Sequence, residues 1–127
     1  LAERTLLLPS AGAMLALAHD HRIMRTDRGF WSLPEVALNM PFPPAMQALV
    51  VARLPTLTAH EAMVTAHRYG ANEALAKGIV EATAPEDAVL AAAIDRVRPL
   101  AAHAGPNLAG VRTHLHAGVL EALTRPS

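Results

Sequence analysis

The chain has 127 residues, enough for one domain or part of one, and about half of them are apolar. Its 11 basic and 11 acidic residues balance, so no net field draws nucleic acid or an anionic membrane. The absence of cysteine excludes disulfides, thiolate metal sites and a cysteine nucleophile in this chain and is typical of a reducing cytoplasm. No stretch approaches the ~20 apolar residues of a membrane helix, and we expect no membrane span.

The first third of the chain predicts strands around one helix. The run at 5–8 predicts a short buried strand. Ser10 then stands where its hydroxyl would cap a helix over 11–18, which is apolar all round and should be buried on every side. Residues 22–25 alternate polar and apolar, and together with 30–33 beyond a Thr-Asp-Arg-Gly turn they predict a hairpin.

The triplet His19-Asp20-His21 has the residue types of a metal site. The helix should end at His19 and a strand begin at His21, so the two rings need not converge. We expect Asp20 to accept backbone N–H bonds at this junction. We therefore predict neither a metal nor another cofactor.

The rest of the chain predicts mainly helices, which begin and end at proline, glycine or a capping residue. They are predicted over 45–54, from a capping box at Thr58 and Glu61 to about Arg68, over 71–77, from about 85 until Pro99 kinks or ends it, and over 108–123, with a strand at 79–82. Apolar stripes on several of these helices need a covering partner, which would be another subunit or the rest of a longer domain.

One carboxylate falls in an almost wholly apolar loop. Glu35 follows Trp-Ser-Leu-Pro and precedes Val-Ala-Leu, and no cation lies within six residues on either side. Apolar surroundings disfavour the charged form of a carboxylate and make it a better base. The alternative is that Glu35 only caps the following segment or points to solvent, as most acids do.

The turn that opens the first helix is built of small residues, Ala11, Gly12 and Ala13. The first N–H groups of a helix have no partner within it, so this turn could hold an oxyanion. Small residues at this place could equally serve ordinary close packing of the helix.

Several of these segments together resemble the crotonase (enoyl-CoA hydratase/isomerase) superfamily, and within it they are most similar to the enoyl-CoA delta-isomerase branch. The motifs that carry the resemblance are Ala-Gly-Ala-Met-Leu-Ala-Leu-Ala-His-Asp at 11–20, Asp-Arg-Gly-Phe at 27–30, Pro-Glu-Val at 34–36, Ala-Leu-Ala-Lys-Gly-Ile-Val at 74–80 and Pro-Glu-Asp at 85–87. It implies an α/β fold, the C-terminal part of a ββα spiral followed by a helical oligomerisation region. The chain would be a single partial domain, with a core remnant and active-site loop at 1–40 and a mainly helical region at 41–127.

The resemblance also implies roles for individual residues. Glu35 stands where the family has its second catalytic glutamate, and Met14 stands where the hydratases have the first. The backbone amide of Ala11, with Gly12 beside it, would hold the thioester oxygen. The substrate pocket would be lined by Met14, Trp31, Leu33 and Pro34. The second oxyanion amide and most of the coenzyme A pocket belong to the N-terminal portion of the family domain, which this chain does not match.

A single carboxylate suits isomerisation better than hydration, because adding water calls for two groups while moving a double bond needs one proton shuttle and an oxyanion hole. We therefore predict an enoyl-CoA isomerase of fatty acid metabolism that shifts a C3 double bond to C2, acts on an acyl-CoA thioester, forms a homo-oligomer (trimer or hexamer) and lies in the cytoplasm. If the chain is truncated, this isomerase-like protein would be inactive on its own. The alternatives are a hydratase that uses Glu35 alone, and a non-catalytic crotonase-fold oligomerisation module.

Overall fold

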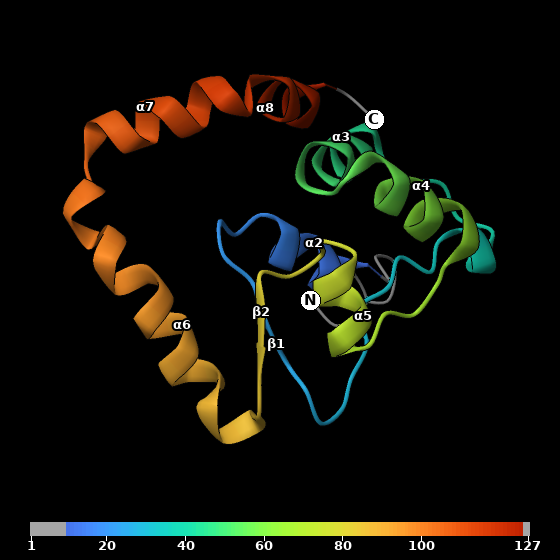
Figure 1. Cartoon of the computed structure of the whole chain (residues 1–127). Helices are drawn as coiled ribbons and strands as arrows, with labels where there is room; N and C mark the ends of the chain where they lie inside the picture. The colour runs from blue at the N-terminus through green and yellow to red at the C-terminus, as the bar shows by residue number, and fades with distance from the viewer. Residues whose placement is uncertain (1–9, 126–127) are drawn as a thin grey trace.

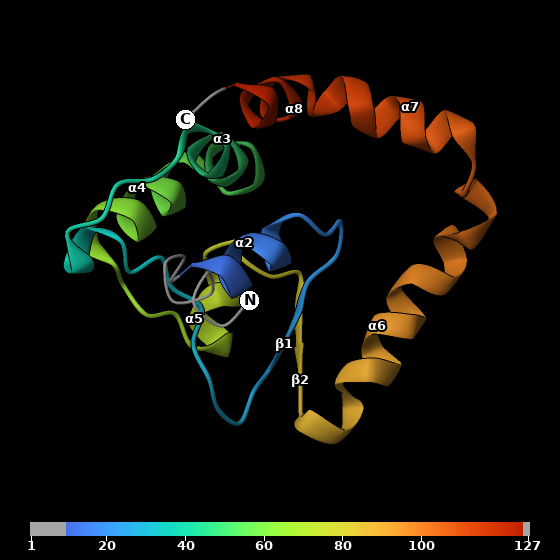
Figure 2. The same cartoon turned by 180° about the vertical axis from the view of Figure 1, so that it is seen from behind.

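The structure is a computed structural model that describes residues 10–125. Seven helices and a two-stranded sheet make up this part, and the strand expected at 5–8 lies outside it. The chain from α6 to α8 arcs around the rest of the molecule, and α8 returns to pack on α3 (Figures 1 and 2). None of the described helices is both long and apolar enough to cross a membrane. The elements are α2 (Ala11–Leu17), β1 (Ile23–Arg25), α3 (Pro44–Arg53), α4 (Thr56–Thr65), α5 (Ala71–Ala76), β2 (Ala82–Ala84), α6 (Val89–Val97), α7 (Pro106–Leu115) and α8 (Ala117–Thr124).

The two strands belong to opposite parts of the sequence, and the predicted hairpin is wrong. β1 pairs in parallel with β2, so that Ile23 lies opposite Ala82. Trp31 instead forms an isolated antiparallel bridge with Tyr69, with N···O distances of 2.9 Å in both directions. The alternation of polar and apolar residues identified the strand at β1 but could not identify its partner. The sheet therefore joins the N-terminal part of the chain to the helical part, and β2 lies later than the strand expected at 79–82.

The hydrophobic core lies between α2, α3, α4 and α5. Leu17, Leu33, Val50 and Tyr69 have no exposed surface, and Met14 packs with them. The expectation that the first helix is buried on every side is wrong, because one of its faces borders a cavity rather than the core. Along that face Leu15 is 65% exposed.

Both predicted ends of the helix expected from Thr58 to about Arg68 are wrong. α4 begins directly after Pro55, so Thr58 lies inside the helix, where its hydroxyl donates to the carbonyl of Lys77 at 2.8 Å instead of capping. The helix ends at Thr65 because Ala66 adopts a left-handed backbone with φ of 56°. The chain beyond it is therefore extended, which frees Tyr69 to bridge Trp31.

The C-terminal helices also differ from the prediction. α6 ends at Val97 and continues as the 3₁₀ segment Arg98–His103, which confirms that Pro99 ends the α-helix. The helix predicted over 108–123 is broken at His116 into α7 and α8. The apolar face of α6 is open: Leu90 is 73% exposed.

A buried arginine ties the start of β1 to the chain that leads into β2. Arg22 donates from Nε to the carbonyl of Ile79 and from its backbone N–H to Glu81, both at 2.6 Å, and its Nη2 lies 3.3 Å from Glu81 Oε1. Burial lowers the pKa of Arg22, and the charge of Glu81 opposes this. The glutamate therefore compensates a cation that has lost most of its water.

We expect Glu81→Gln to lower the free energy of unfolding by about 1–3 kcal/mol, because it leaves the buried charge of Arg22 without its counterion. Urea denaturation measures this loss. Glu86→Gln is the matched control, since Glu86 pairs with Arg25 at 71% side-chain exposure and should cost less than about 1 kcal/mol. Equal losses in the two variants would show that burial of Arg22 does not matter.

The backbone of Tyr69 pairs with Trp31, which lies on the segment that leads to Glu35. The side chain of Tyr69 is hydrogen-bonded to an acidic residue. Its hydroxyl donates to Glu61 Oε1 at 2.7 Å. This hydrogen bond, with the charges of Lys77 and His67, lowers the pKa of Glu61 against the opposing effect of desolvation, and burial raises the pKa of Tyr69 well above its ordinary range. Because the pKa of Glu61 is lowered by folding, its contribution to stability is present above its ordinary value of 4.5 and is lost as the pH falls through the folded pKa.

We therefore expect Tyr69→Phe to destabilise the protein near neutral pH and to cost progressively less as the pH falls below 4.5 and through the folded pKa of Glu61. Urea denaturation of both proteins across this range measures the difference. A difference that stays constant with pH would mean that Tyr69 acts through packing alone.

Candidate active site

Glu35 is buried although it lies on a loop. Its residue is 2% exposed, Oε1 accepts a hydrogen bond from Ser10 Oγ, and Oε2 is buried without a hydrogen-bond partner among the described residues. The alternative that Glu35 points to solvent is wrong. Glu35 does precede the 3₁₀ turn η1 (Val36–Leu38), but its side chain makes no capping hydrogen bond there.

The backbone on both sides of Glu35 is held in place. The N–H of Met40 donates to the carbonyl of Glu35 at 2.9 Å, and the N–H of Leu38 donates to the carbonyl of Pro34 at 3.1 Å. On the other side, Leu33 is fully buried, and the bridge from Trp31 holds the strand-like segment before it. The carboxylate is therefore carried by a rigid loop.

Ser10 joins this loop to the first turn of α2. Ser10 is 1% exposed, and its carbonyl accepts the N–H of Met14 at 2.8 Å, the first rung of the helix. The prediction that the Ser10 hydroxyl caps the helix is wrong, because that hydroxyl donates to Glu35 instead. The N–H groups of Ala11 and Gly12 come before that of Met14 in the chain, so they take no part in the hydrogen bonds within the helix. The structure thus brings Glu35 to the turn of small residues.

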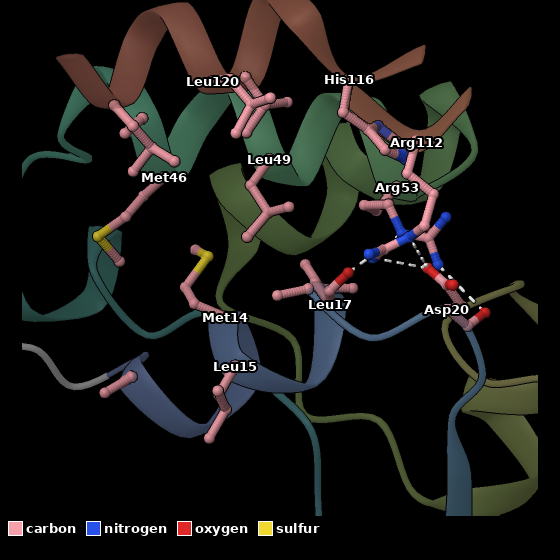
Figure 3. Close-up of a pocket in the computed structure, with 15 residues that line it drawn as sticks. Met14, Leu15, Leu17, Asp20, Met46, Leu49, Arg53, Arg112, His116 and Leu120 are labelled. Carbon is pink, nitrogen blue, oxygen red and sulfur yellow. Dashed lines mark hydrogen bonds and ion pairs between the residues drawn. The ribbon is translucent and has the colours of Figure 1, made fainter. Parts of the chain in front are cut away.

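A cavity of about 500 Å³ runs along the other face of α2 (Figure 3). Ala11 and Met14 line it, so it begins at the same turn that Ser10 opens. Met14, Met46, Leu49 and Leu120 point toward one another across it in Figure 3. Its further apolar lining residues are Leu15, Leu17, Ala18, Ala45, Val119 and Leu123.

Charged residues close the end of the cavity that lies beyond the C-terminus of α2 (Figure 3). Arg53 donates to the carbonyls of Leu17 and His19 at 3.1 and 2.9 Å, which satisfies the end of the helix. Asp20 forms an ion pair with Arg112 of α7 at 3.0 Å. The expectation that the Asp20 side chain accepts backbone N–H bonds is therefore wrong, since its partner is an arginine side chain of α7.

The residues predicted to line the substrate pocket do not all meet. Met14 lines the cavity beside α2, whereas Leu33 is enclosed in the hydrophobic core and Pro34 lies outside the cavity lining. Trp31 borders a separate hollow of about 350 Å³ together with His21. The lining residues of α3 and α8 were missed as pocket residues, although their apolar stripes were visible in the sequence.

The histidine-containing triplet does not form a cluster. His19 Nδ1 contacts the carbonyl of Leu15 at 2.8 Å, while Asp20 is paired with Arg112. Within residues 10–125, no three histidine or acidic side chains lie close enough to hold a metal ion.

The fold is that of the crotonase superfamily. An enoyl-CoA isomerase structure from Mycobacterium tuberculosis matches with a TM-score of 0.79 at 26% identity, covering 87% of this chain and 49% of that one. The structure of human mitochondrial delta3-delta2-enoyl-CoA isomerase shares the fold, with a TM-score of 0.79 at 23% identity over 90% of this chain and 45% of that one.

The sequence comparisons agree with the fold. The family model for enoyl-CoA hydratase/isomerase matches residues 8–126. Enoyl-CoA delta isomerase 2, peroxisomal, of Arabidopsis thaliana is 34% identical over 124 residues, which cover 91% of this chain and 52% of that relative. This chain belongs to the enoyl-CoA hydratase/isomerase family. It spans about half the length of the relatives it matches over most of its own length.

Proposed function

We propose that the chain carries the catalytic base of an enoyl-CoA isomerase, which moves a C3 double bond to C2 of a fatty acyl-CoA. The observation that carries this proposal is the carboxylate of Glu35, buried beside the first turn of α2 with one oxygen lacking a partner among the described residues. An oxygen that is already positioned and not hydrogen-bonded is free to accept a proton.

The reaction needs one proton to move twice. Glu35 Oε2 takes a proton from C2, and the electrons of that C–H bond delocalise into a dienolate whose charge rests on the thioester oxygen. The amide of Ala11, with that of Gly12 beside it, would stabilise this oxygen, and an oxyanion donor is worth on the order of 10²–10³ in rate. Glu35 then returns the proton at C4, which leaves the double bond between C2 and C3 and restores the carboxylate.

The cavity beside α2 supports a place for the acyl tail. It begins at Ala11 and Met14, next to the proposed oxyanion position, and its walls are almost entirely apolar. Burial of each methylene contributes about 0.8 kcal/mol, so such walls would bind a fatty chain and not a polar group. Trp31, Leu33 and Pro34 would act from behind the loop, by keeping Glu35 directed at the substrate.

Met14 favours isomerisation over hydration, since a thioether at this position cannot activate water. Purified protein at its natural full length should convert a 3-enoyl-CoA to the conjugated 2-enoyl-CoA, followed by the absorbance of the product. The same protein should add water to a 2-enoyl-CoA far more slowly. Efficient hydration would favour the hydratase alternative, and no turnover of either substrate would favour a non-catalytic module.

The oligomeric state and the cellular location of the protein stay predictions. The exposed apolar side chains of α6 and α7, such as Leu90, Ile94 and Leu115, support a homo-oligomer, either a trimer or a hexamer, which light scattering would measure. The lack of cysteine supports a reducing compartment such as the cytoplasm. Imaging of the tagged protein tests this, because the Arabidopsis relative is named as peroxisomal.

A further inference from the structure

We propose that Ser10 is the positioning residue of the proton shuttle: its hydroxyl holds Oε1 of Glu35, so that Oε2 alone takes the proton from C2 and returns it to C4. This inference rests on the proposed isomerase function and assigns a role to a residue that stood out in the sequence only as a helix cap.

The two side chains are buried together. Ser10 and Glu35 are 1% and 2% exposed, and their hydrogen bond joins residues 25 positions apart. Each partner is fixed by its backbone, Ser10 through the N–H of Met14 and Glu35 through the N–H of Met40. A rotation of the carboxyl group would therefore have to break a buried hydrogen bond, which is costly where water cannot replace it.

The two oxygens of Glu35 have different surroundings. Oε1 accepts the proton of the Ser10 hydroxyl, whereas Oε2 is buried and unpartnered among the described residues. A serine hydroxyl has one proton to donate, and that proton is engaged with Oε1. Oε2 is thus the oxygen whose lone pairs are not engaged by a described residue, and a held carboxylate keeps it in one orientation.

This hydrogen bond is compatible with both states of the shuttle. While Glu35 is ionised, Oε1 accepts from Ser10 as a carboxylate oxygen. Once Oε2 has taken the C2 proton, Oε1 becomes the carbonyl oxygen of the acid and can still accept the same hydrogen bond. The carboxyl group then need not rotate between the two transfers, so the proton taken from C2 stays beside the substrate until it reaches C4.

The test measures where the transferred proton comes from. The full-length protein, Ser10→Ala and Thr58→Ala are each assayed in D2O for kcat, KM and the deuterium found at C4 of the product. Thr58 is the matched control because it is another buried hydroxyl, 5% exposed, that donates to a backbone carbonyl away from Glu35.

We expect Ser10→Ala to lower kcat roughly 10-fold to 100-fold with KM nearly unchanged, as misplacement of a reacting group does. Deuterium at C4 should rise several-fold, because a carboxyl group free to rotate exchanges its proton with solvent before returning it. Thr58→Ala should leave the deuterium content and kcat as they are in the parent protein, even if it lowers stability.

A parent-like rate and deuterium content in Ser10→Ala would overturn the inference while leaving Glu35 as the base. Failure of the proposed function looks different, since the parent protein itself would then show no isomerisation that depends on Glu35. Should Ser10→Ala not fold, the isosteric pair Ser10→Thr and Ser10→Val replaces it. These two differ only in the hydroxyl, and the inference requires that the threonine variant exchange less and turn over faster than the valine variant.

Discussion

Glu35→Gln is expected to lower kcat for isomerisation by about 10³-fold or more, because the amide cannot take a proton and general acid–base catalysis typically contributes 10²–10⁴-fold. Glutamine has the shape of glutamate, and its carbonyl oxygen can still accept the hydrogen bond from Ser10. KM should therefore change little. Steady-state kinetics with a 3-enoyl-CoA measure both quantities.

The same substitution should not destabilise the protein. A buried carboxylate oxygen without a partner costs free energy in the folded state, and an uncharged amide costs less. Glu86→Gln provides the control, because it removes one negative charge at an exposed position and should leave kcat unchanged. A Glu35→Gln protein with parent-like kcat would remove the carboxylate from the mechanism.

Leu120→Trp is expected to narrow the range of acyl chains that the protein accepts. Leu120 points into the cavity from α8, opposite Met46 and Leu49 (Figure 3). An indole there would occupy space needed by the distal carbons of a long acyl chain. If four methylenes are excluded at about 0.8 kcal/mol each, kcat/KM for long chains should fall by roughly 200-fold.

Short acyl chains supply the internal comparison, since they should react with nearly parent-like kcat/KM. Leu57→Trp is the matched variant, because Leu57 lies on α4, is 86% exposed and does not line the cavity. It should leave the chain-length profile as it is. A Leu120→Trp profile that falls equally for short and long chains would place the acyl tail elsewhere.

The sequence indicated that Glu35 could be buried but left open that its side chain caps the following segment or points to solvent. Apolar neighbours on both sides indicated a buried carboxylate, and Pro34 indicated a chain that leaves an extended segment. The bond from Ser10 was not predictable, because serine before a helix is a common cap and nothing local distinguishes a hydroxyl that turns away toward a distant acid.

The errors in the fold have a common physical origin in contacts between residues far apart in sequence. β1 was recognised as a strand, but its true partner β2 lies nearly sixty residues later, where local periodicity gives no information. The apparent capping box failed similarly, since Thr58 donates to Lys77 and Glu61 accepts from Tyr69. Each of these two side chains forms its hydrogen bond with a residue outside α4 and not with the backbone at the start of the helix.

The cavity residues were missed because they come from separate helices. The apolar stripes on several of the predicted helices were expected to need a covering partner, either another subunit or the rest of a longer domain. The structure packs α8 on α3 within the same chain, so part of both stripes lines one cavity instead. Sequence periodicity shows that a helix face is apolar, not what it faces.

The cavity wall formed by α8 lies far in sequence from the proposed base. Acyl-chain preference and proton transfer would therefore depend on different parts of the chain. The proposed base sits at Glu35, in the first third of the chain, whereas Val119, Leu120 and Leu123 come from the last ten residues that the structure describes. Exchanging only α8 between relatives would change which fatty substrates fit while leaving the proposed proton transfer intact. Substitutions confined to α8 would then adapt the protein to a different supply of acyl chains.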